Sequence, residues 1–283
     1  MSRVAGEIVF DERRSAERLS EFVAASVDAA QASEVPFSHL ILGPVFPRDV
    51  YEAMRIGMPA ASAYRPMSGR SRCNRAPDGT PTRIKIDLFA EYIRHLPPEM
   101  HGIWGLVGRA LCAPAVKDAL VRRLAPGLRR RFGTDFTQVA LYPIPILTRD
   151  YPGYRIGPHT DTKWKAITVQ IYLPRDDRHS HIGTIFHERR ADGTLARKTQ
   201  MRFSPNSGYA FAVGEDTWHS VDPVGPEVRA RDSILLTYFV DSGILRTLRN
   251  RLKRAGNFLA NELRRGATQR QSTAPNRSWP SSV

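Results

Sequence analysis

Short strand-like segments follow one another between residues 136 and 241, and this texture restricts the fold more than any other feature of the sequence. The segments are rich in β-branched and aromatic residues, and Gly, Pro and Asp residues separate them. They cover residues 139–142, 166–173, 184–186, 209–213 and 233–239. Because no helical pattern interrupts the series, we expect a double-sheet jelly roll or a cupin-like barrel.

The residues before this β core read mainly as helices. Apolar residues recur at helical spacing over 11–31, 98–112 and 114–132, and Gly133 is the expected end of the last of these helices. The other expected elements are a strand over 36–42, a helix that starts near Pro47 and a long loop, a candidate lid, over the Pro-, Gly-, Ser- and Arg-rich residues 65–86.

These assignments define an α+β chain in four parts. We expect an N-terminal helical support region over residues 1–135, the β core over 136–241, a basic amphipathic helix over 242–267 and a disordered tail over 268–283. The tail is rich in Ser, Gln, Pro and Arg, which cannot bury a hydrophobic core.

The strand expected over 166–173 predicts how the helices and the β core meet. Side chains alternate along a strand, so one face of this segment is wholly apolar and the other is largely polar. The apolar residues are Ile167, Val169, Ile171 and Leu173. We expect this face to pack on the N-terminal helices, and the other face, which includes Gln170, to be polar enough to line a wet cavity.

The composition is that of a globular protein. Of 283 residues, 41% are hydrophobic and 25% are charged. Cys73 and Cys112 are the only cysteines, so a disulfide framework is excluded. No apolar run reaches the roughly 18 residues of a membrane span, and the N-terminus lacks the apolar core of a signal peptide. We therefore expect a cytoplasmic protein.

The chain is strongly basic, with a net charge of +14, and part of this charge is local. Nine basic residues and one acidic residue lie between Ser242 and Val283. Within this stretch one helical stripe is apolar: Ile244, Leu245, Leu248, Leu252, Leu259 and Leu263. We expect the stripe to dock on the barrel or on a second subunit. A basic helix of this kind can also bind nucleic acid or an anionic membrane.

Two histidines and one aspartate are the candidate metal ligands. His159 and Asp161 lie just ahead of a strand, and residues i and i+2 of an extended segment point to the same face. His219 follows a second strand. Two His and one carboxylate with open positions form the facial triad of non-haem Fe(II) sites. Zinc hydrolases also use His and Asp, so the ligand types alone do not identify the metal.

Other residues of similar chemistry are interpreted as structural. His179, His181 and His187 lie in or beside a charged turn, and we read them as loop histidines rather than ligands. Trp164 and Trp218 flank the candidate ligands, where they either wall a pocket or belong to the core.

Six short motifs resemble, in the same order along the chain, the central motifs of the Fe(II)/2-oxoglutarate-dependent dioxygenases. They are His159-Thr160-Asp161, Tyr172-Leu173-Pro174, Gly183-Thr184-Ile185-Phe186, Pro205-Asn206-Ser207-Gly208, Trp218-His219-Ser220-Val221 and Arg231-Asp232-Ser233. The resemblance implies a double-stranded β-helix core, Fe(II) bound by His159, Asp161 and His219, and 2-oxoglutarate and O2 as cosubstrates. The implied activity is hydroxylation of an unactivated C–H bond with release of succinate and CO2.

The cosubstrate 2-oxoglutarate needs a cation for its distal carboxylate, and arginine offers a fork of matching geometry. Arg231 and Ser233 share a strand face, which resembles the family's Arg-x-Ser carboxylate clamp. Arg229 has the same parity and is the alternative cation. Among the tyrosines near the core, which include Tyr142 and Tyr154, Tyr172 is kept as a candidate hydroxyl donor to the same carboxylate.

Two functions of other kinds stay open at this point. One is a cupin-type metal enzyme with zinc or iron and no 2-oxo acid. The other is a basic module that binds nucleic acid or a membrane on an inactive barrel, although the intact triad and Arg231 argue against it. For the enzyme we expect a small molecule or metabolite as substrate, and we assign neither its identity nor an oligomeric state.

Overall fold

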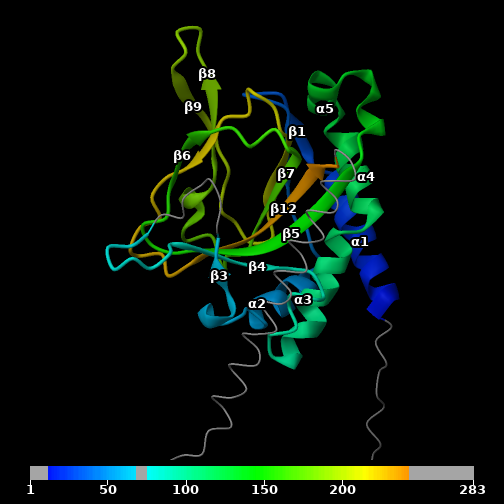
Figure 1. Ribbon diagram of the computed structural model, residues 1–283, viewed down its shortest axis with the longest axis vertical. Coiled ribbons are helices and arrows are strands. Elements are labelled where there is room, and N and C mark those ends of the chain that lie inside the picture. Colours follow the sequence, from blue (N-terminus) through cyan, green and yellow to red (C-terminus); the bar gives the residue numbers. More distant parts are fainter. Residues whose placement is uncertain (1–11, 68–74, 242–283) are drawn as a thin grey trace, which may run out of the picture.

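Two antiparallel sheets and a group of helices make up the chain in the computed structural model, which describes residues 12–67 and 75–241 (Figure 1). The helices of these residues are α1 (Glu12–Asp28), α2 (Arg48–Ile56), α3 (Pro98–Leu111), α4 (Pro114–Arg123) and α5 (Ala125–Phe132), with short 3-10 turns at Ala61–Ala63, Thr134–Gln138 and Ser180–Ile182. The strands are β1 (Gln31–Ser33), β2 (His39–Leu42), β3 (Arg65–Pro66), β4 (Arg83–Asp87), β5 (Leu141–Asp150), β6 (Ile156–His159), β7 (Lys165–Tyr172), β8 (Ile185–Arg189), β9 (Leu195–Gln200), β10 (Gly208–Ala212), β11 (His219–Val221) and β12 (Arg231–Val240).

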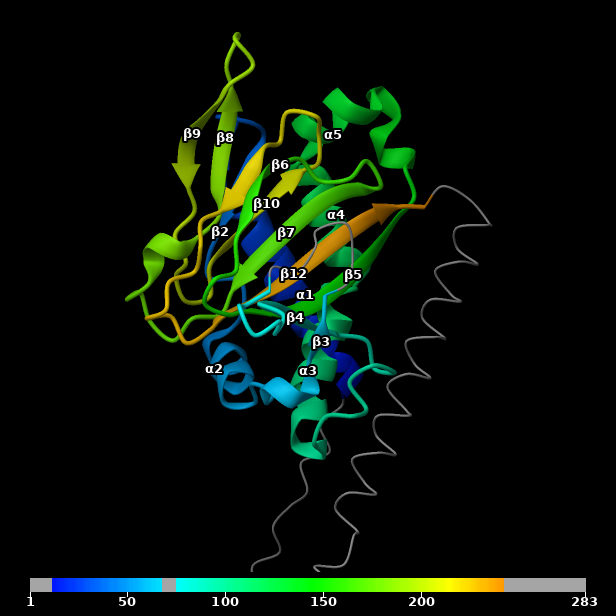
Figure 2. The ribbon, with the colours of Figure 1, turned by 60° about the vertical axis from the view of Figure 1, so that its left-hand side comes forward.

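The larger sheet has eight strands in the order β1-β2-β10-β7-β12-β5-β4-β3, and the smaller has four in the order β6-β11-β8-β9. Strands β8 and β9 extend beyond the rest of the smaller sheet as a hairpin (Figure 2). This combination of helices with antiparallel sheets is compatible with a double-stranded β-helix.

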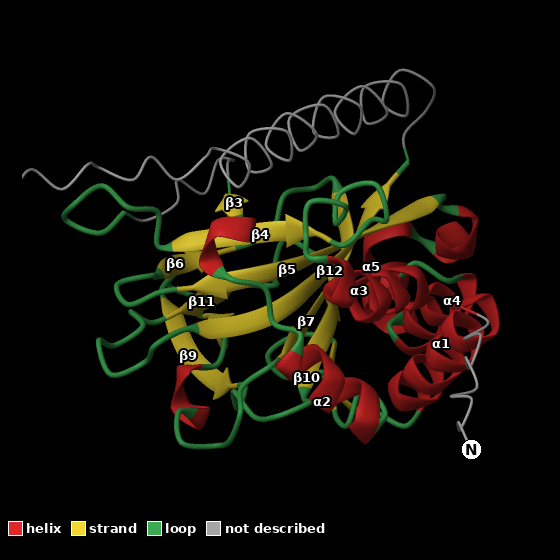
Figure 3. Cartoon of the chain, turned by 90° about the horizontal axis from the view of Figure 1, so that it is seen from below, coloured by secondary structure: helices red, strands yellow, loops and turns green. Residues whose placement is uncertain are grey.

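One face of the larger sheet packs on the helices. Helices α1, α3, α4 and α5 lie together on one side of the sheet (Figure 3). Ile167 and Ile171 of β7 share a hydrophobic core with Val23 of α1, Trp104 of α3 and Leu120 of α4. The expectation that the apolar face of this strand packs on the N-terminal helices is confirmed. Each such side chain stabilises the fold by roughly 1.5–3 kcal/mol through burial.

The other face of the larger sheet packs against the smaller sheet through a second, aromatic core. Phe37, Tyr209 and Phe211 meet Phe186 of β8 there, and the rings of Phe37 and Phe186 are 4.7 Å apart between centroids. The polar side chains of β7 on this face are buried and hydrogen-bonded; Gln170, for example, is only 5% exposed. They therefore form a polar lining inside the protein rather than the wall of an open cavity.

The residues before 136 do more than support the β core, which corrects the expected division of the chain. Four strands from this part, β1 to β4, belong to the larger sheet, so the sheet does not begin at residue 136. Residues 83–86 were expected to belong to a loop, but they lie in β4 and pair in register with β5. Their alternation of charged residues with Ile84 and Ile86 is a strand pattern, which the neighbouring Pro and Gly residues hide in the sequence.

The helix expected over 114–132 is two helices. Helix α4 ends at Arg123 and α5 begins at Ala125, with Pro126 in its first turn. Proline has no N–H to donate to the preceding turn, so a new helix begins here instead of the old one continuing. Gly133 ends α5 with a φ of 78°, a conformation that favours glycine, as expected. The first helix stops at Asp28, because the chain then turns into β1.

Asn206 of the fourth motif attaches the N-terminal region to the β core, and Gly208 of the same motif lets two strands of the larger sheet approach closely. The Asn206 side chain accepts hydrogen bonds from the backbone N–H groups of Val45 and Phe46, and donates one to the carbonyl of Phe46. A Cβ on Gly208 would lie 2.1 Å from the carbonyl oxygen of Gln170 in β7. A glycine is therefore required for β10 to approach β7 this closely.

Two of the expected parts, the basic helix over 242–267 and the tail over 268–283, lie outside the described residues. Among the helices that the structure describes, none combines the length and the apolar character needed to cross a bilayer.

Candidate metal centre and carboxylate site

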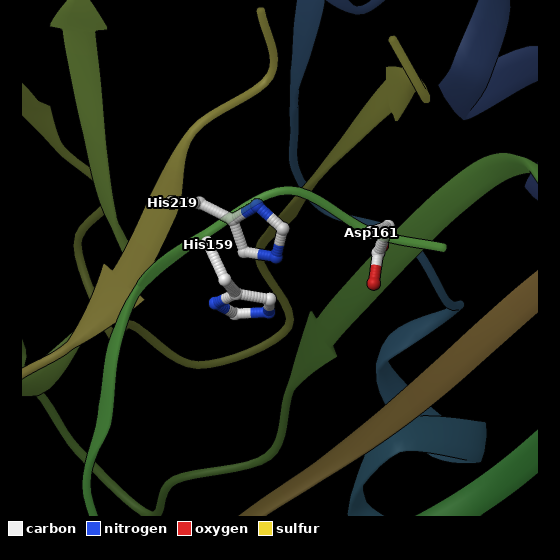
Figure 4. A group of neighbouring side chains, drawn as sticks. All are labelled: His159, Asp161 and His219. Carbon is white, nitrogen blue, oxygen red and sulfur yellow. The ribbon is translucent and has the colours of Figure 1, made fainter. Parts of the chain in front are cut away.

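His159, Asp161 and His219 converge although they are separated by up to sixty residues of chain. His159 ends β6 and His219 begins β11, and the two are direct partners in the register of these strands. One ligand atom from each of the three side chains lies within 4.8 Å of the other two. Figure 4 shows the imidazole rings side by side, with Asp161 across from them. Within residues 12–67 and 75–241, no other group of three such side chains is close enough to share a cation.

Each candidate histidine is oriented by its own backbone. His159 Nδ1 lies 3.0 Å from the carbonyl oxygen of Gly157, and His219 Nδ1 lies 2.9 Å from that of Thr217. A carbonyl oxygen can only accept, so in the neutral rings Nδ1 carries the proton. This leaves the lone pair of Nε2 on each ring available for a metal, an arrangement common among metal-binding histidines.

Asp161 is held by two donors from β7. Its Oδ1 accepts from Lys165 Nζ at 2.6 Å, and its Oδ2 accepts from Thr168 Oγ1 at 2.6 Å. Burial by itself raises the pKa of Asp161, but the charges of Lys165 and His219 and the two hydrogen bonds outweigh it and lower the pKa to about 2. Each carboxylate oxygen keeps a second lone pair that could bind a cation.

The protonation states suit a divalent cation. Burial lowers the pKa of His219 to about 4, although Asp161 and the Thr217 carbonyl act in the opposite direction. At neutral pH His219 is therefore neutral and Asp161 is ionised, which are the forms that bind metal. Two imidazoles and one carboxylate match the ligand set of Fe(II) oxygenases.

The loop that carries Asp161 is tied to helix α5 by Arg131. The Arg131 guanidinium donates to the backbone carbonyls of Lys163 and Lys165 beside that loop, and to the carbonyl of Val213 at 2.6 Å. Through Arg131, α5 thus holds together the loop that carries Asp161 and the end of the segment that leads to His219.

Arg231 is the first residue of β12 and is buried, with 1% of its surface exposed. Its Nε donates to the carbonyl of Ile182 at 3.0 Å, and its Nη1 donates to Asp150 Oδ2 at 2.8 Å. Its Nη2 is buried and has no hydrogen-bond partner. An unpaired buried donor costs roughly 1–3 kcal/mol, so this atom is suited to an acceptor from a ligand. Arg229 is exposed, which separates the two arginines that the sequence left as alternatives.

Ser233 and Tyr172 lie on the same interior face as Arg231, and they are direct partners in the register of β12 and β7. Ser233 Oγ accepts from Gln170 and lies 2.9 Å from Thr148 Oγ1. The Tyr172 hydroxyl donates to Thr184 Oγ1 at 3.1 Å and accepts from the Thr184 N–H. Its ring lies against Arg231, whose guanidinium carbon is 5.4 Å from the ring centroid.

None of the other tyrosines and histidines that the sequence singled out belongs to the metal-binding group. The Tyr142 ring stacks on Phe239, and the Tyr154 ring lies under the guanidinium of Arg83. His179 and His181 lie at the turn before β8, outside the metal-binding group. The last of the three, His187, is a buried strand residue rather than a loop residue, and its Nε2 bonds Ser220 Oγ at 2.7 Å.

Several residues of the site had no motif in the sequence. Lys165 and Thr168 hold Asp161, while Asp150 and Arg83 join Arg231. The signal for Asp150 and Arg83 is positional, because Asp150 stands opposite Arg231 on the neighbouring strand and Arg83 stands opposite Asp150 on the strand after that. That signal appears only once the strand register is known.

A pocket of about 820 Å³ opens beside the metal-binding group. It lies between α5, the loop around Thr162 and the loop before His219, and Asp161 forms part of its wall. Neither candidate histidine lines it, so the pocket adjoins the candidate centre and does not enclose it. Trp164 stands at this pocket and is 47% exposed, whereas Trp218 lies among the partly buried residues.

No family model matches the chain, and no curated protein matches it. It is similar to several solved structures. A prolyl-4-hydroxylase from Pseudomonas putida is 17% identical with a TM-score of 0.46, over 78% of this chain and 100% of that one. A prolyl hydroxylase from Trichoplax adhaerens, solved with a peptide of hypoxia inducible factor, is 10% identical with a TM-score of 0.44, over 83% and 94%. An oxidoreductase of the 2OG-Fe(II) oxygenase family from Burkholderia pseudomallei is 15% identical with a TM-score of 0.39, over 76% and 89%. The case for a function rests on the side chains of the site.

Proposed function

We propose that the chain is an Fe(II)- and 2-oxoglutarate-dependent dioxygenase with a double-stranded β-helix core, and that it hydroxylates an unactivated C–H bond. The observation that carries the proposal is the convergence of His159, Asp161 and His219 within 4.8 Å. These three residues would hold the iron from one side, leaving its other positions for the cosubstrates.

The protein's own contribution is to set the charge and orientation of these ligands. The backbone carbonyls of Gly157 and Thr217 keep Nε2 of each histidine unprotonated. Lys165 and Thr168 hold the Asp161 carboxylate in its ionised form. When bound, Fe(II), 2-oxoglutarate and O2 would supply the oxidation of a C–H bond with release of succinate and CO2.

Arg231 supports the 2-oxo acid over a cupin-type metal enzyme that lacks one. The unpaired Nη2 of this buried arginine offers a charged donor to a carboxylate. Ser233 on the same strand face is the second residue proposed for this carboxylate, and the Tyr172 ring packs on the guanidinium. The substrate would enter through the pocket beside Asp161. The volume of this pocket is in the range of small-molecule sites.

The test is an anaerobic titration of the protein with Fe(II) and then with 2-oxoglutarate. We expect a weak visible charge-transfer band only when both are present, and succinate release when O2 is admitted. The band should be lost in His219→Ala and kept in His181→Ala, a control histidine that is exposed. An Fe(II) complex that gives neither band nor succinate with 2-oxoglutarate would favour the cupin-type enzyme.

A further inference from the structure

Three charged side chains, two of them buried and one largely buried, stand in a row on one face of the larger sheet. Arg83 of β4 is paired in register with Asp150 of β5, and Asp150 is paired with Arg231 of β12. Asp150 and Arg231 are almost completely buried, and the Arg83 side chain is 15% exposed. Two guanidinium groups therefore meet one carboxylate inside the protein.

The carboxylate is not shared equally. Arg83 binds Asp150 with two hydrogen bonds, from Nε to Oδ1 at 2.7 Å and from Nη2 to Oδ2 at 3.2 Å. Arg231 reaches Asp150 with a single bond, from Nη1 to Oδ2 at 2.8 Å. Arg83 is also fixed by the ring of Tyr154, 4.4 Å from its guanidinium carbon. Asp150 is thus mainly the partner of Arg83.

The remaining contacts of Arg231 are neutral. They are the carbonyl of Ile182 and the rings of Tyr172 and Phe203, each ring centroid 5.4 Å away. The row of Arg83, Asp150 and Arg231 therefore carries a net charge of about +1 in a buried place, together with the unpaired Nη2. Burying an uncompensated charge is costly. One carboxylate from a ligand would both neutralise this charge and accept a hydrogen bond from Nη2.

We infer that Arg83 is a positioning residue for the cosubstrate: by binding Asp150 with two hydrogen bonds, it leaves Arg231 open toward the carboxylate of 2-oxoglutarate. The identity of the anion rests on the proposed function; the role of Arg83 rests on the geometry of the row. Without Arg83, Asp150 would be free to form a two-bond pair with Arg231 and cancel the charge that attracts the ligand. Asp150 would then compete with the carboxylate of the ligand for Arg231.

This competition can be tested by calorimetric titration of 2-oxoglutarate into the anaerobic Fe(II)-loaded protein. Arg83→Gln should weaken binding about tenfold or more, the loss typical of a charge-assisted interaction. The double variant Arg83→Gln with Asp150→Asn should recover affinity to within a few-fold of wild type, because no carboxylate then competes for Arg231. Arg83→Lys keeps the charge with a single donor group. Its affinity for 2-oxoglutarate should lie between that of Arg83→Gln and that of wild type.

Arg149→Gln is the matched control. Arg149 and Asp232 form a two-bond ion pair between the same strands, β5 and β12, but they alternate with Asp150 and Arg231 and so point to the other face. The affinity of Arg149→Gln for 2-oxoglutarate should equal that of wild type. The Fe(II) stoichiometry should be unchanged in every folded variant.

The outcomes separate this inference from the proposed function. If wild type binds Fe(II) but no 2-oxoglutarate, both are wrong. If wild type binds 2-oxoglutarate and Arg83→Gln binds it equally well, only the role of Arg83 is wrong. A folded double variant as weak as Arg83→Gln would also overturn the competition. Should Arg83→Gln not fold, the double variant and Arg83→Lys decide the same question.

Discussion

His219 lies directly opposite His159 in the register of β11 and β6, and the centroids of their imidazole rings are 4.3 Å apart. Two rings this close, each with Nδ1 bonded to a backbone carbonyl, present two Nε2 lone pairs to one place. The pair depends on the register of two short strands, because a shift by one residue would turn one ring to the opposite face.

The first prediction is that Fe(II) binding requires all three ligands. Replacing His159, Asp161 or His219 with Ala should lower iron occupancy at least tenfold while the fold is kept, since each change removes a ligand without opening the apolar core. Iron content after anaerobic loading measures the effect, with circular dichroism to verify folding. Asp161→Ala with unchanged iron content and full turnover would show that the metal site is misassigned.

The second prediction separates the two arginines near the start of β12. Arg231→Ala should raise the concentration of 2-oxoglutarate required on the order of tenfold or more, because a charge-assisted interaction contributes about 1.5–3 kcal/mol. The requirement for Fe(II) should change much less. Arg229→Ala, which alters an exposed arginine of the same parity, is the control. If only Arg229→Ala shows this defect, Arg229 rather than Arg231 is the cation that binds the 2-oxoglutarate carboxylate.

The third prediction concerns acid stability at Asp87, which is bonded by Lys85 Nζ at 2.9 Å and by Arg65. Burial raises the pKa of Asp87, but the charges and hydrogen bonds of Lys85 and Arg65 outweigh it and hold the pKa below its usual value. A lowered pKa stabilises the fold above the unfolded-state pKa of about 4, and this stabilisation is lost as the pH falls through the folded-state value.

Asp87→Asn should therefore destabilise the protein at neutral pH by about 1–3 kcal/mol. The difference from wild type should begin to shrink below about pH 4, where Asp87 of the unfolded chain takes up a proton, and should vanish once the pH falls below the lower pKa of the folded state. Thermal unfolding of both proteins between pH 2 and 7 measures this difference. A difference that stays constant over the whole range would mean that the ion pairs of Asp87 do not stabilise the fold.

The fourth prediction tests the contact between β10 and β7. Gly208→Ala places a Cβ 2.1 Å from the Gln170 carbonyl oxygen, so the strands must separate. We expect a loss of about 1–3 kcal/mol or more in the free energy of unfolding, as for other overpacked sites. Gly102→Ala in α3 is the control, since a Cβ there meets nothing within 4 Å and alanine favours a helix. Equal stability of the two variants would contradict the close approach.

Much of the local structure could be predicted from the sequence. The helix expected over 98–112 is α3, and Gly133 ends α5 as expected. The alternation along β7 predicted which face meets the helices, and the two-residue spacing of His159 and Asp161 predicted that they point the same way. These features depend on residues close together in the chain, where the period of a helix or strand is written directly in the residue order.

The tertiary structure alone decided which distant residues share a site. Residues 83–87 became a strand because β5 offered it a partner, against the Pro- and Gly-rich composition around it. Arg231 rather than Arg229 entered the interior, and Asp150 and Arg83 came to stand beside it, through the register of β12, β5 and β4. Strand register joins residues that are far apart in the chain, and no local pattern in the sequence records which of them will face each other.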